Sequence, residues 1–574
     1  MKDSRARFEA LAVFLFILTL FVGVGPDFGP YWDSWFYNDH AIRWSAWFAS
    51  WVRESPAPPL AEWRWYFPEE PRHPPLLEWG GGLSHLLFHR VLGGLGSCRL
   101  VVEASTALWL GAGYYFLRVR LGRGAALLGA ALFLGSPRSF LHGVLYAVDG
   151  LVAAVYGLVL LSFLYWDRGR LGKALVGVAL FIGFLTKLQA LYLVPLLVGW
   201  VCLLNLKDGT DGSSRRVSLS ADLGRAIPVV AAAGAVTFAV WPAMWLDFPK
   251  GIRDYVQFIT EHGNLPVLYF DRLFKGWERP PWHYPWVFTA LALPLTATVP
   301  VLARGIRMVN SFSRAPSPAE RLSGGGRLDR FRGGLGKAEA LLWAGAALPL
   351  VTSSLPQAPK YDGVRLLLPA YGPLYLLAAA EISSWLGTLR RRLKGRVKPR
   401  VWGLAAAGTA VLLLTPTLRI HPFNLVYYSP LVGGTAGARK AGFDLEYLGV
   451  SMHRLNPTLQ RVATGRDILL LAGCNAVVGT EDREGWPSIP KGMFVADFKL
   501  IREIDYRGRQ VFAILSSRYS DLGPEAHLVL ERLEPLDTVE YRGERLFSLH
   551  RIAPEFVASL PKELAPKTEE APEP

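Results

Sequence analysis

The chain has 574 residues, of which 51% are hydrophobic and 19% are charged, and its net charge is +15. This composition excludes a string of soluble domains, because soluble chains carry about 25% charged residues and few long apolar runs. It also argues against a nucleic-acid-binding protein, since the basic residues stand in short loops between apolar runs, as in membrane proteins.

Apolar runs of about 20 residues, the length that crosses a bilayer core, recur through the first 420 residues. The first run follows Lys2, Arg5 and Arg7 and has no small-residue cleavage site, so we expect a retained anchor. We predict eleven spans, at 9–25, 98–117, 124–142, 147–166, 173–187, 188–206, 225–246, 284–303, 338–355, 365–388 and 401–420.

Proline or polar residues stand within or at the end of three of these spans. Pro137 and Arg138 interrupt the span at 124–142 and make it the weakest of the set. The stretch 173–206 is long enough for one helix, but Lys187 and Gln189 at its middle favour two short helices.

The distribution of charge indicates how the spans are oriented. If the N-terminus lies inside, the inner segments contain 28 Lys and Arg residues, and the outer segments before the last span contain 14. This bias agrees with the positive-inside rule. An odd number of spans then places residues 421–574 outside.

The first outer loop, residues 26–97, begins with aromatic residues at helical spacing. They predict an amphipathic helix from Trp35 to Val52 that lies on the membrane surface. Asp33 stands just before this helix, among tryptophans, where a carboxylate costs desolvation energy. We therefore expect a functional role for Asp33.

Three more polar residues of this loop are candidates for a site. Asp39 and His40 lie within the predicted helix and fit a solvated helix face as well as a functional role. His73 stands at a corner between two proline-bounded segments, where a rigid turn directs its side chain. A histidine at such a corner is equally often only a cap.

Further charged and aromatic residues stand at the outer ends of the spans. Each alone fits a snorkelling side chain or a structural ion pair. Together they offer cations for a phosphate, carboxylates for hydroxyl groups or as a base, and aromatic rings for sugar faces. No cluster has the spacing of a metal site, so a divalent metal is compatible with the set but not required. The set comprises Arg138, Asp149, Lys187, Lys360, Tyr361, Asp362 and Arg365, with His262 in the fourth outer loop.

The remaining segments are not typical of membrane spans. Loop 304–337 is rich in Gly, Ser and Arg, which predicts a flexible inner linker that touches anionic lipid. Residues 421–560 alternate β-rich runs such as DILLLAGC and QVFAILSS with polar stretches, which predicts a small α/β domain outside the membrane. The Pro- and Glu-rich tail, 561–574, is predicted to be disordered.

A series of motifs in order resembles the bacterial lipid-carrier-dependent glycosyltransferases of the GT-C superfamily, relatives of protein O-mannosyltransferases and aminoarabinose transferases. The motifs run from about residue 25 to about residue 460 and are strong as a series. They are YWDxxxYxxHAIRW, HPPL, SPR, VDG, TKLQALYLVP, WPxxW…H…PPWHYP, PKYDGVRLLLPAYGPL and HPFNLVYYSPLVGGTAGA.

The resemblance implies a GT-C type α-helical polytopic membrane protein with about eleven transmembrane helices, whose domain 1–420 carries the activity. It also implies a polyprenyl-phosphate-linked sugar donor and an active site on the outer face of a bacterial inner membrane. The family's catalytic carboxylate falls on Asp33. Relatives often have Asp-Glu there, whereas this chain has Asp33-Ser34, which leaves a second acidic or acceptor role to Asp149, Asp39 or His73.

The implied reaction moves a sugar to a lipid, glycan or protein acceptor, with Asp33 as general base. Lys187, Arg138 and Arg365 would bind the donor phosphate, and Tyr361 and His262 would bind substrate. Two alternatives are a lipid-linked sugar flippase or transporter, and a polysaccharide polymerase or ligase. A transporter places charges at mid-membrane and often repeats its halves, whereas these charges sit at span ends.

Overall fold

The computed structural model describes residues 2–31, 33–53, 73–205, 219–245, 247–261, 265–276, 278–313, 335–393, 399–473, 489–506 and 508–561. The chain divides into two compact units, and each draws on separate parts of the sequence. A helical unit comprises Met1–Pro26, Tyr37–Leu265 and Arg279–Leu431. The second unit comprises Asp27–Phe36, Pro266–Glu278 and Val432–Pro574.

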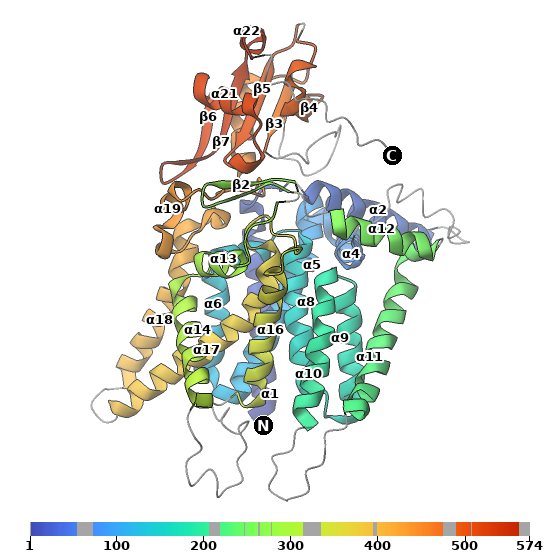
Figure 1. Cartoon of the computed structure of the whole chain (residues 1–574), viewed down its shortest axis with the longest axis vertical. Helices are drawn as coiled ribbons and strands as arrows, with labels where there is room; N and C mark the ends of the chain where they lie inside the picture. Colours follow the sequence, from blue (N-terminus) through green and yellow to red (C-terminus); the bar gives the residue numbers. More distant parts are fainter. Residues whose placement is uncertain are drawn as a thin grey trace, which may run out of the picture. The chain divides into compact units, whose positions relative to one another are not determined.

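The helical unit is built from long helices joined by short connections (Figure 1). Figure 1 shows α5, α8 and α9 side by side. Three short 3-10 turns matter for the site: η4 (Leu188–Tyr192), η7 (Arg365–Leu367) and η8 (Asn424–Val426). The helices are α1 (Lys2–Val24), α2 (Ser34–Arg53), α4 (Leu76–Leu92), α5 (Gly94–Leu121), α6 (Arg123–Leu134), α7 (Pro137–His142), α8 (Val148–Ser162), α9 (Gly169–Phe184), α10 (Leu193–Asn205), α11 (Leu219–Val240), α12 (Phe248–Glu261), α13 (Tyr284–Ala292), α14 (Leu295–Ser313), α16 (Lys337–Ser353), α17 (Leu368–Arg392) and α18 (Pro399–Ile420).

Five helices in the described part of the chain are long and apolar enough to cross a membrane. They run over Ser4–Asp27, Gly94–Leu121, Val148–Tyr165, Arg365–Arg392 and Arg400–Ile420. Three shorter apolar helices cover Arg123–Leu134, Leu188–Leu204 and Gly224–Val240. The helical unit therefore has the make-up of a multi-pass membrane protein, and the count of eleven spans stays a prediction.

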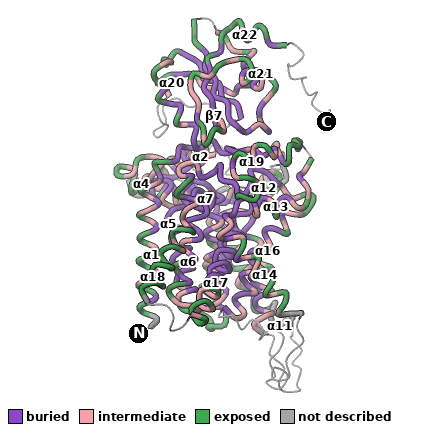
Figure 2. The backbone as a smooth tube through the Cα atoms, turned by 90° about the vertical axis from the view of Figure 1, so that its left-hand side faces the viewer, coloured by how far each residue is buried: buried purple, intermediate pink, exposed green. Residues whose placement is uncertain are grey.

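The centre of the helical unit is α17. Its most apolar stretch is 94% buried, and Figure 2 shows the tube coloured by burial. It packs against α5, α6, α8, α14 and α16. A helix that is hydrophobic all round is either a core helix or a membrane span that faces lipid, and the burial of α17 places it in the core of the helical unit. Trp109 of α5 fits against two glycines, because a Cβ on Gly157 or Gly372 would come within 2.7 or 2.8 Å of its indole ring. Close approach of small residues is how helices associate in a bilayer.

Two predicted spans are each split into two α-helices, and proline is the reason in both. The span at 124–142 is split into α6 and α7, and the span at 284–303 into α13 and α14. The residue before each proline, Ser136 and Leu293, has an extended backbone with ψ of 102° and 136°. Proline disfavours the helical conformation in the residue that precedes it. The prediction of two helices within 173–206 is confirmed by α9 and α10.

The inner linker predicted at 304–337 begins too early. Residues up to Ser313 continue α14, and Lys337 begins α16, while 314–334 lie outside the described residues. Arg304 is buried within α14 rather than exposed in a loop. Its helix continues because an apolar stripe through Leu302, Ile306 and Val309 persists at helical spacing.

The second unit contains a mixed five-stranded sheet in the order β4-β3-β5-β7-β6. Strand β3 pairs in parallel with β4 and β5, and β7 pairs antiparallel with β5 and β6. One face packs Leu470, Ala513 and Leu515 against Ala526 and Val529 of α21. The bounds are β1 (Val267–Tyr269) and β2 (Arg272–Phe274), which form a hairpin, then α19 (Gly434–Lys440), α20 (Asn456–Val462), β3 (Ile468–Ala472), β4 (Phe494–Asp497), β5 (Val511–Ser516), α21 (Pro524–Arg532), β6 (Asp537–Tyr541), β7 (Glu544–Ile552) and α22 (Pro554–Ala558). The predicted tail lies outside the described residues from 562 onward.

Candidate active site

A buried ion-pair cluster forms where three elements of the helical unit meet. Asp149 stands in the first turn of α8, Lys187 directly precedes η4, and Arg365 begins η7. Lys187 donates to one carboxylate oxygen of Asp149 at 2.9 Å, and Nε of Arg365 donates to the other at 2.7 Å. The positive end of the α8 dipole adds to the stabilisation of this carboxylate. One aspartate thus holds two cations at fixed positions.

The loop before α17 completes the cluster from the other side. Nη1 of Arg365 donates to Asp362 at 2.8 Å. Asp362 adopts a left-handed backbone with φ of 49°, followed by Gly363 with φ of 60°, so the chain turns sharply here. This turn places the Asp362 carboxylate against the guanidinium of Arg365, three residues further along the chain.

Arg138 contributes a further buried cation. Its Nε donates to the carbonyl oxygen of Tyr427 at 3.0 Å, and its guanidinium lies 4.4 Å from the ring centroid of Tyr428. Only 1% of Arg138 is exposed to solvent. His142, one turn along the same short helix, interacts electrostatically with Arg138, Asp149 and Arg365. Arg138 therefore belongs to the same charged region as the ion pairs.

In the part of this region that the structure describes, cations outnumber carboxylates. Three cations, Arg138, Lys187 and Arg365, face two carboxylates, Asp149 and Asp362, among the described residues. A buried cation is costly unless an anion or a hydrogen-bond acceptor pairs with it. A phosphate is the anion that guanidinium and ammonium groups bind best.

Tyr361 is buried beside this cluster. It lies within electrostatic reach of Lys187, Arg365 and Asp149. Burial raises the pKa of its phenol, against the opposing effect of Lys187 and Arg365. Tyr361 therefore stays protonated at neutral pH and can donate a hydrogen bond to an oxyanion.

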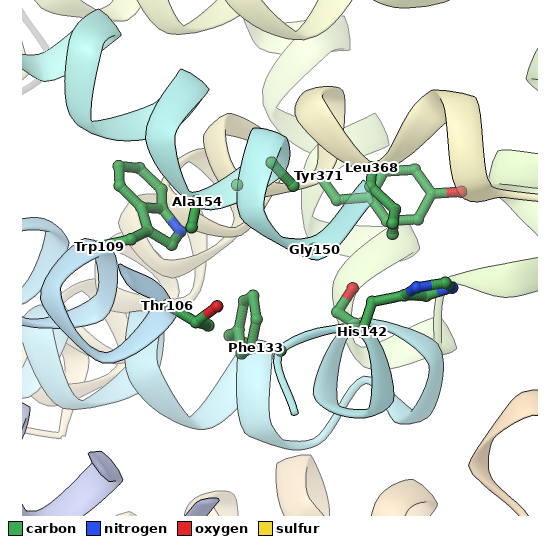
Figure 3. A pocket seen from close by; sticks show the side chains of 12 residues that line it. Thr106, Trp109, Phe133, His142, Gly150, Ala154, Leu368 and Tyr371 are labelled. Carbon is green, nitrogen blue, oxygen red and sulfur yellow. The ribbon is translucent and has the colours of Figure 1, made fainter. Parts of the chain in front are cut away.

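A small cavity lies under the start of α8 (Figure 3). The space open to the centre of a water molecule in this cavity is about 20 Å³. The cavity therefore has room for one water molecule but not for a sugar. In Figure 3 the ring of His142 and the hydroxyl of Tyr371 extend in the same direction, away from Trp109 and Thr106. Gly150 allows α8 to start here, because a Cβ at this position would collide with the carbonyl oxygen of His142.

A larger, apolar cavity of about 640 Å³ lies between α13, α14, α16 and α17. Small side chains leave this space open, among them Ala290, Gly305 and Ala346. At one end Trp286 donates from its indole to Ser354 at 3.0 Å, next to the loop that carries Lys360. Lys360 itself donates to the carbonyl oxygen of Leu355 at 2.7 Å. The cavity has the size and apolar lining that suit a hydrocarbon chain.

The residues predicted in the first outer loop lie in different places. Asp33 is half-buried in a turn of the second unit, just before α2. Asp39 forms a partly exposed ion pair with Arg43 at 2.7 Å, as expected for a helix surface. The ring of His73 lies 4.9 Å from that of Phe258. His262 lies outside the described residues.

His40 does not lie on a solvated face, so that interpretation of it was wrong. It is buried, and its Nδ1 lies 3.0 Å from Oε1 of Glu78. Trp44 donates to the other oxygen of Glu78 at 3.3 Å. Glu78 joins α2 to α4, and sequence reasoning missed it. The available signal was a lone carboxylate in the apolar run HPPLLEWGGGL.

Comparison with known proteins finds similar solved structures, among them two of one protein. No family model and no curated protein sequence matches the chain. The structures are of ArnT from Cupriavidus metallidurans in the apo state and of the same protein bound to undecaprenyl phosphate. They share 16% and 15% identity with this chain, at TM-scores of 0.44 and 0.42. Each match covers 94% of this chain and 97% of the other.

Proposed function

We propose that this chain is a membrane glycosyltransferase that moves a sugar from a polyprenyl-phosphate carrier to a lipid, glycan or protein acceptor. The observation that carries the proposal is the buried cluster in which Asp149 holds Lys187 and Arg365, with Arg138 nearby. The excess positive charge matches a phosphate. The apolar cavity in the same unit matches the hydrocarbon chain of a lipid carrier.

The proposed reaction is a displacement at the anomeric carbon of the sugar. The acceptor oxygen or nitrogen forms a bond to this carbon while the bond from carbon to the phosphate oxygen breaks. The carboxylate of Asp33 takes the acceptor proton as general base. The electron pair of the broken bond stays on the polyprenyl phosphate. The transition state resembles an oxocarbenium ion, as in other glycosyl transfers.

The cations act on the leaving group. Negative charge grows on the phosphate as the sugar departs, and positions held in advance by Asp149 and Asp362 let Lys187 and Arg365 stabilise it without rearrangement. Tyr361 donates a hydrogen bond to the same group. Both carboxylates of the cluster are already paired with cations, and this arrangement requires no divalent metal.

The proposal is tested on purified full-length protein in nanodiscs. The protein is incubated with a panel of polyprenyl-phosphate sugars and with a membrane extract from a strain that lacks the gene. Release of polyprenyl phosphate that depends on the extract is the expected result. Movement of the intact donor across a bilayer without release would instead identify a flippase. The absence of both release and movement would overturn the proposal.

The role of Asp33 has its own test. Asp33→Asn keeps the shape of the side chain and removes its proton affinity, so turnover should fall by about 10²- to 10⁴-fold. Binding of undecaprenyl phosphate should stay within about threefold, since the proposed phosphate cations are elsewhere in the sequence. Turnover of Asp33→Asn within about threefold of the wild type would remove Asp33 from the mechanism and make Asp149 the next residue to test.

A further inference from the structure

The segment that carries Asp33 belongs to the second unit, although the chain on both sides of it belongs to the helical unit. Asp27–Phe36 clusters with Val432–Pro574. The backbone amide of Gly29 donates to the carbonyl oxygen of Val450 at 3.1 Å. Nδ1 of His453 donates to the same oxygen at 3.0 Å. The segment is therefore attached to one turn of the C-terminal part of the chain.

Gly29 fits at this attachment because it has no side chain. A Cβ at position 29 would lie 2.7 Å from the carbonyl oxygen of Val450 and closer still to the ring of His453. A rotamer change can move the ring of His453, but the Val450 oxygen belongs to the backbone. Any larger residue must therefore displace the segment or the turn that receives it.

The chain between Gly29 and Asp33 leaves little freedom. The amide of Ser34 donates to the carbonyl oxygen of Tyr31 at 2.9 Å, and the amide of Tyr31 donates to the hydroxyl of Ser34 at 3.0 Å. These bonds close a turn with Asp33 inside it, and both Tyr31 and Ser34 are buried. Ser34 thus closes the turn that presents Asp33.

The receiving turn is braced from within. Glu446 is buried, and its two oxygens accept hydrogen bonds from the amide of Gly449 at 3.2 Å and from the hydroxyl of Ser451 at 2.9 Å. These bonds fix the backbone on both sides of Val450. The carbonyl oxygen that holds Gly29 is thereby held in place by a side chain that does not touch the segment itself.

We propose that residues 446–453 are positioning residues for Asp33, so that the C-terminal part of the chain takes part in catalysis by holding the carboxylate in place. The inference rests on the proposed role of Asp33 as general base. It names Gly29 as the point of attachment and Glu446 as the brace. A displacement of about 1 Å at a catalytic group costs about 100-fold in rate, so the loss of these positioning residues should lower the turnover rate.

The first test uses Gly29→Ala in the full-length protein in nanodiscs. Turnover with the donor that proves active in the panel should fall by about 10- to 100-fold, while the KM for that donor changes by less than about threefold. Hydrogen–deuterium exchange of the backbone in 27–36 should become faster, because the attachment is weakened. Gly523→Ala is the matched control, since a Cβ there meets only a side-chain oxygen of Glu525 at 3.7 Å. Its turnover and its exchange in 27–36 should equal those of the wild type.

A second pair of variants keeps the test decisive if Gly29→Ala does not fold. Glu446→Ala removes both acceptors of the brace and should slow turnover and speed exchange in 27–36. Glu446→Gln keeps an acceptor for the Gly449 amide and a partner for the Ser451 hydroxyl, so it should restore most of the lost turnover. A purely structural role of Glu446 would change protein yield in both variants and leave the exchange of 27–36 unchanged, which would overturn the inference.

The outcomes separate this inference from the proposed function. Wild-type turnover and exchange in Gly29→Ala would overturn the inference, as would lost turnover without faster exchange in 27–36. If the wild type transfers no sugar from any polyprenyl phosphate, the proposed function fails and the exchange measurement still decides the attachment. Faster exchange in Gly29→Ala but not in Gly523→Ala would then support it, and equal exchange in both would overturn it.

Discussion

At the scale of single residues, the proposed site depends most on the three cations that would bind the donor phosphate. A buried hydrogen bond to a charged group contributes about 1.5–3 kcal/mol. Lys187→Ala should therefore weaken the binding of undecaprenyl phosphate by about 10- to 100-fold, measured by titration of the purified protein. Arg138→Ala and Arg365→Ala should act in the same direction. Lys250→Ala, which removes an exposed ion pair with Asp254, is the control. Unchanged affinity in all three cluster variants would contradict the phosphate role.

The protonation of the Glu446 carboxyl group should make the stability of the second unit depend on pH. Burial raises the pKa of Glu446 to about 7, in spite of its hydrogen bonds, while the unfolded chain has the ordinary value near 4.5. The folded state therefore holds this proton more tightly than the unfolded state. The stabilisation is complete below about pH 4.5 and is lost as the pH rises through 7.

The replacement Glu446→Gln should remove this dependence. At pH 8 the variant should be more stable than the wild type by up to about 3 kcal/mol, and near pH 4.5 the difference should shrink towards zero. Hydrogen exchange in β3, β5 and β7 across this pH range measures the difference. A stability difference that is the same at pH 5 and pH 8 would show that the carboxyl group does not titrate in this range.

How much the sequence predicts differs from residue to residue within the site. Asp149, Lys187 and Arg365 were grouped because each stands at a span end, and they do meet. The sequence could not show that one aspartate bridges both cations, because their contact depends on helices far apart in the chain. The partnership of His40 with Glu78 was missed for the same reason, since it joins two helices across the loop between them.

At the scale of elements, hydrophobic length locates helices better than it locates their ends. The spans at 98–117, 147–166 and 401–420 correspond to α5, α8 and α18. The errors are local and have one cause each: a residue forced out of the helical conformation by a following proline, or an arginine read as the start of a loop. Arg304 looked like a loop residue because its two acidic partners stand on other helices.

Those partners form a buried network between α14, α16 and α17. Arg304 donates to both oxygens of Glu339, at 2.7 and 2.6 Å, and lies 3.6 Å from Glu381, which also pairs with Arg307. Arg304→Met should destabilise the protein by about 3–5 kcal/mol, because it leaves the buried Glu339 carboxylate unpaired. Adding Glu339→Met should recover most of that loss, since both charges are then removed. Thermal unfolding in detergent measures both variants, and a double variant no more stable than the single one would contradict the pairing.

At the scale of the whole molecule, the second unit agrees with one part of the topology predicted from charge, namely which segments share a side of the membrane. Its three pieces, Asp27–Phe36, Pro266–Glu278 and Val432–Pro574, come from the three segments that the charge bias assigns to the outer side. Pieces that fold into one unit must lie on one side of a membrane. The contact of Asp149 with Lys187 agrees, because α8 and α9 run between them and return the chain to the same end.

The predicted orientation therefore fixes the side of the membrane on which each candidate residue should lie. With 28 Lys and Arg residues in inner segments against 14 in outer ones, the N-terminus and residues 314–334 should lie in the cytoplasm and residues 421–574 outside it. A periplasmic phosphatase fused after residue 430 should be active, and the same reporter fused after residue 320 should be inactive. A reporter that is active only in the cytoplasm should give the opposite result at both positions. Cytoplasmic activity after residue 430 would place the whole second unit inside, and Asp33 with it, because the three pieces of that unit cannot be separated by a bilayer.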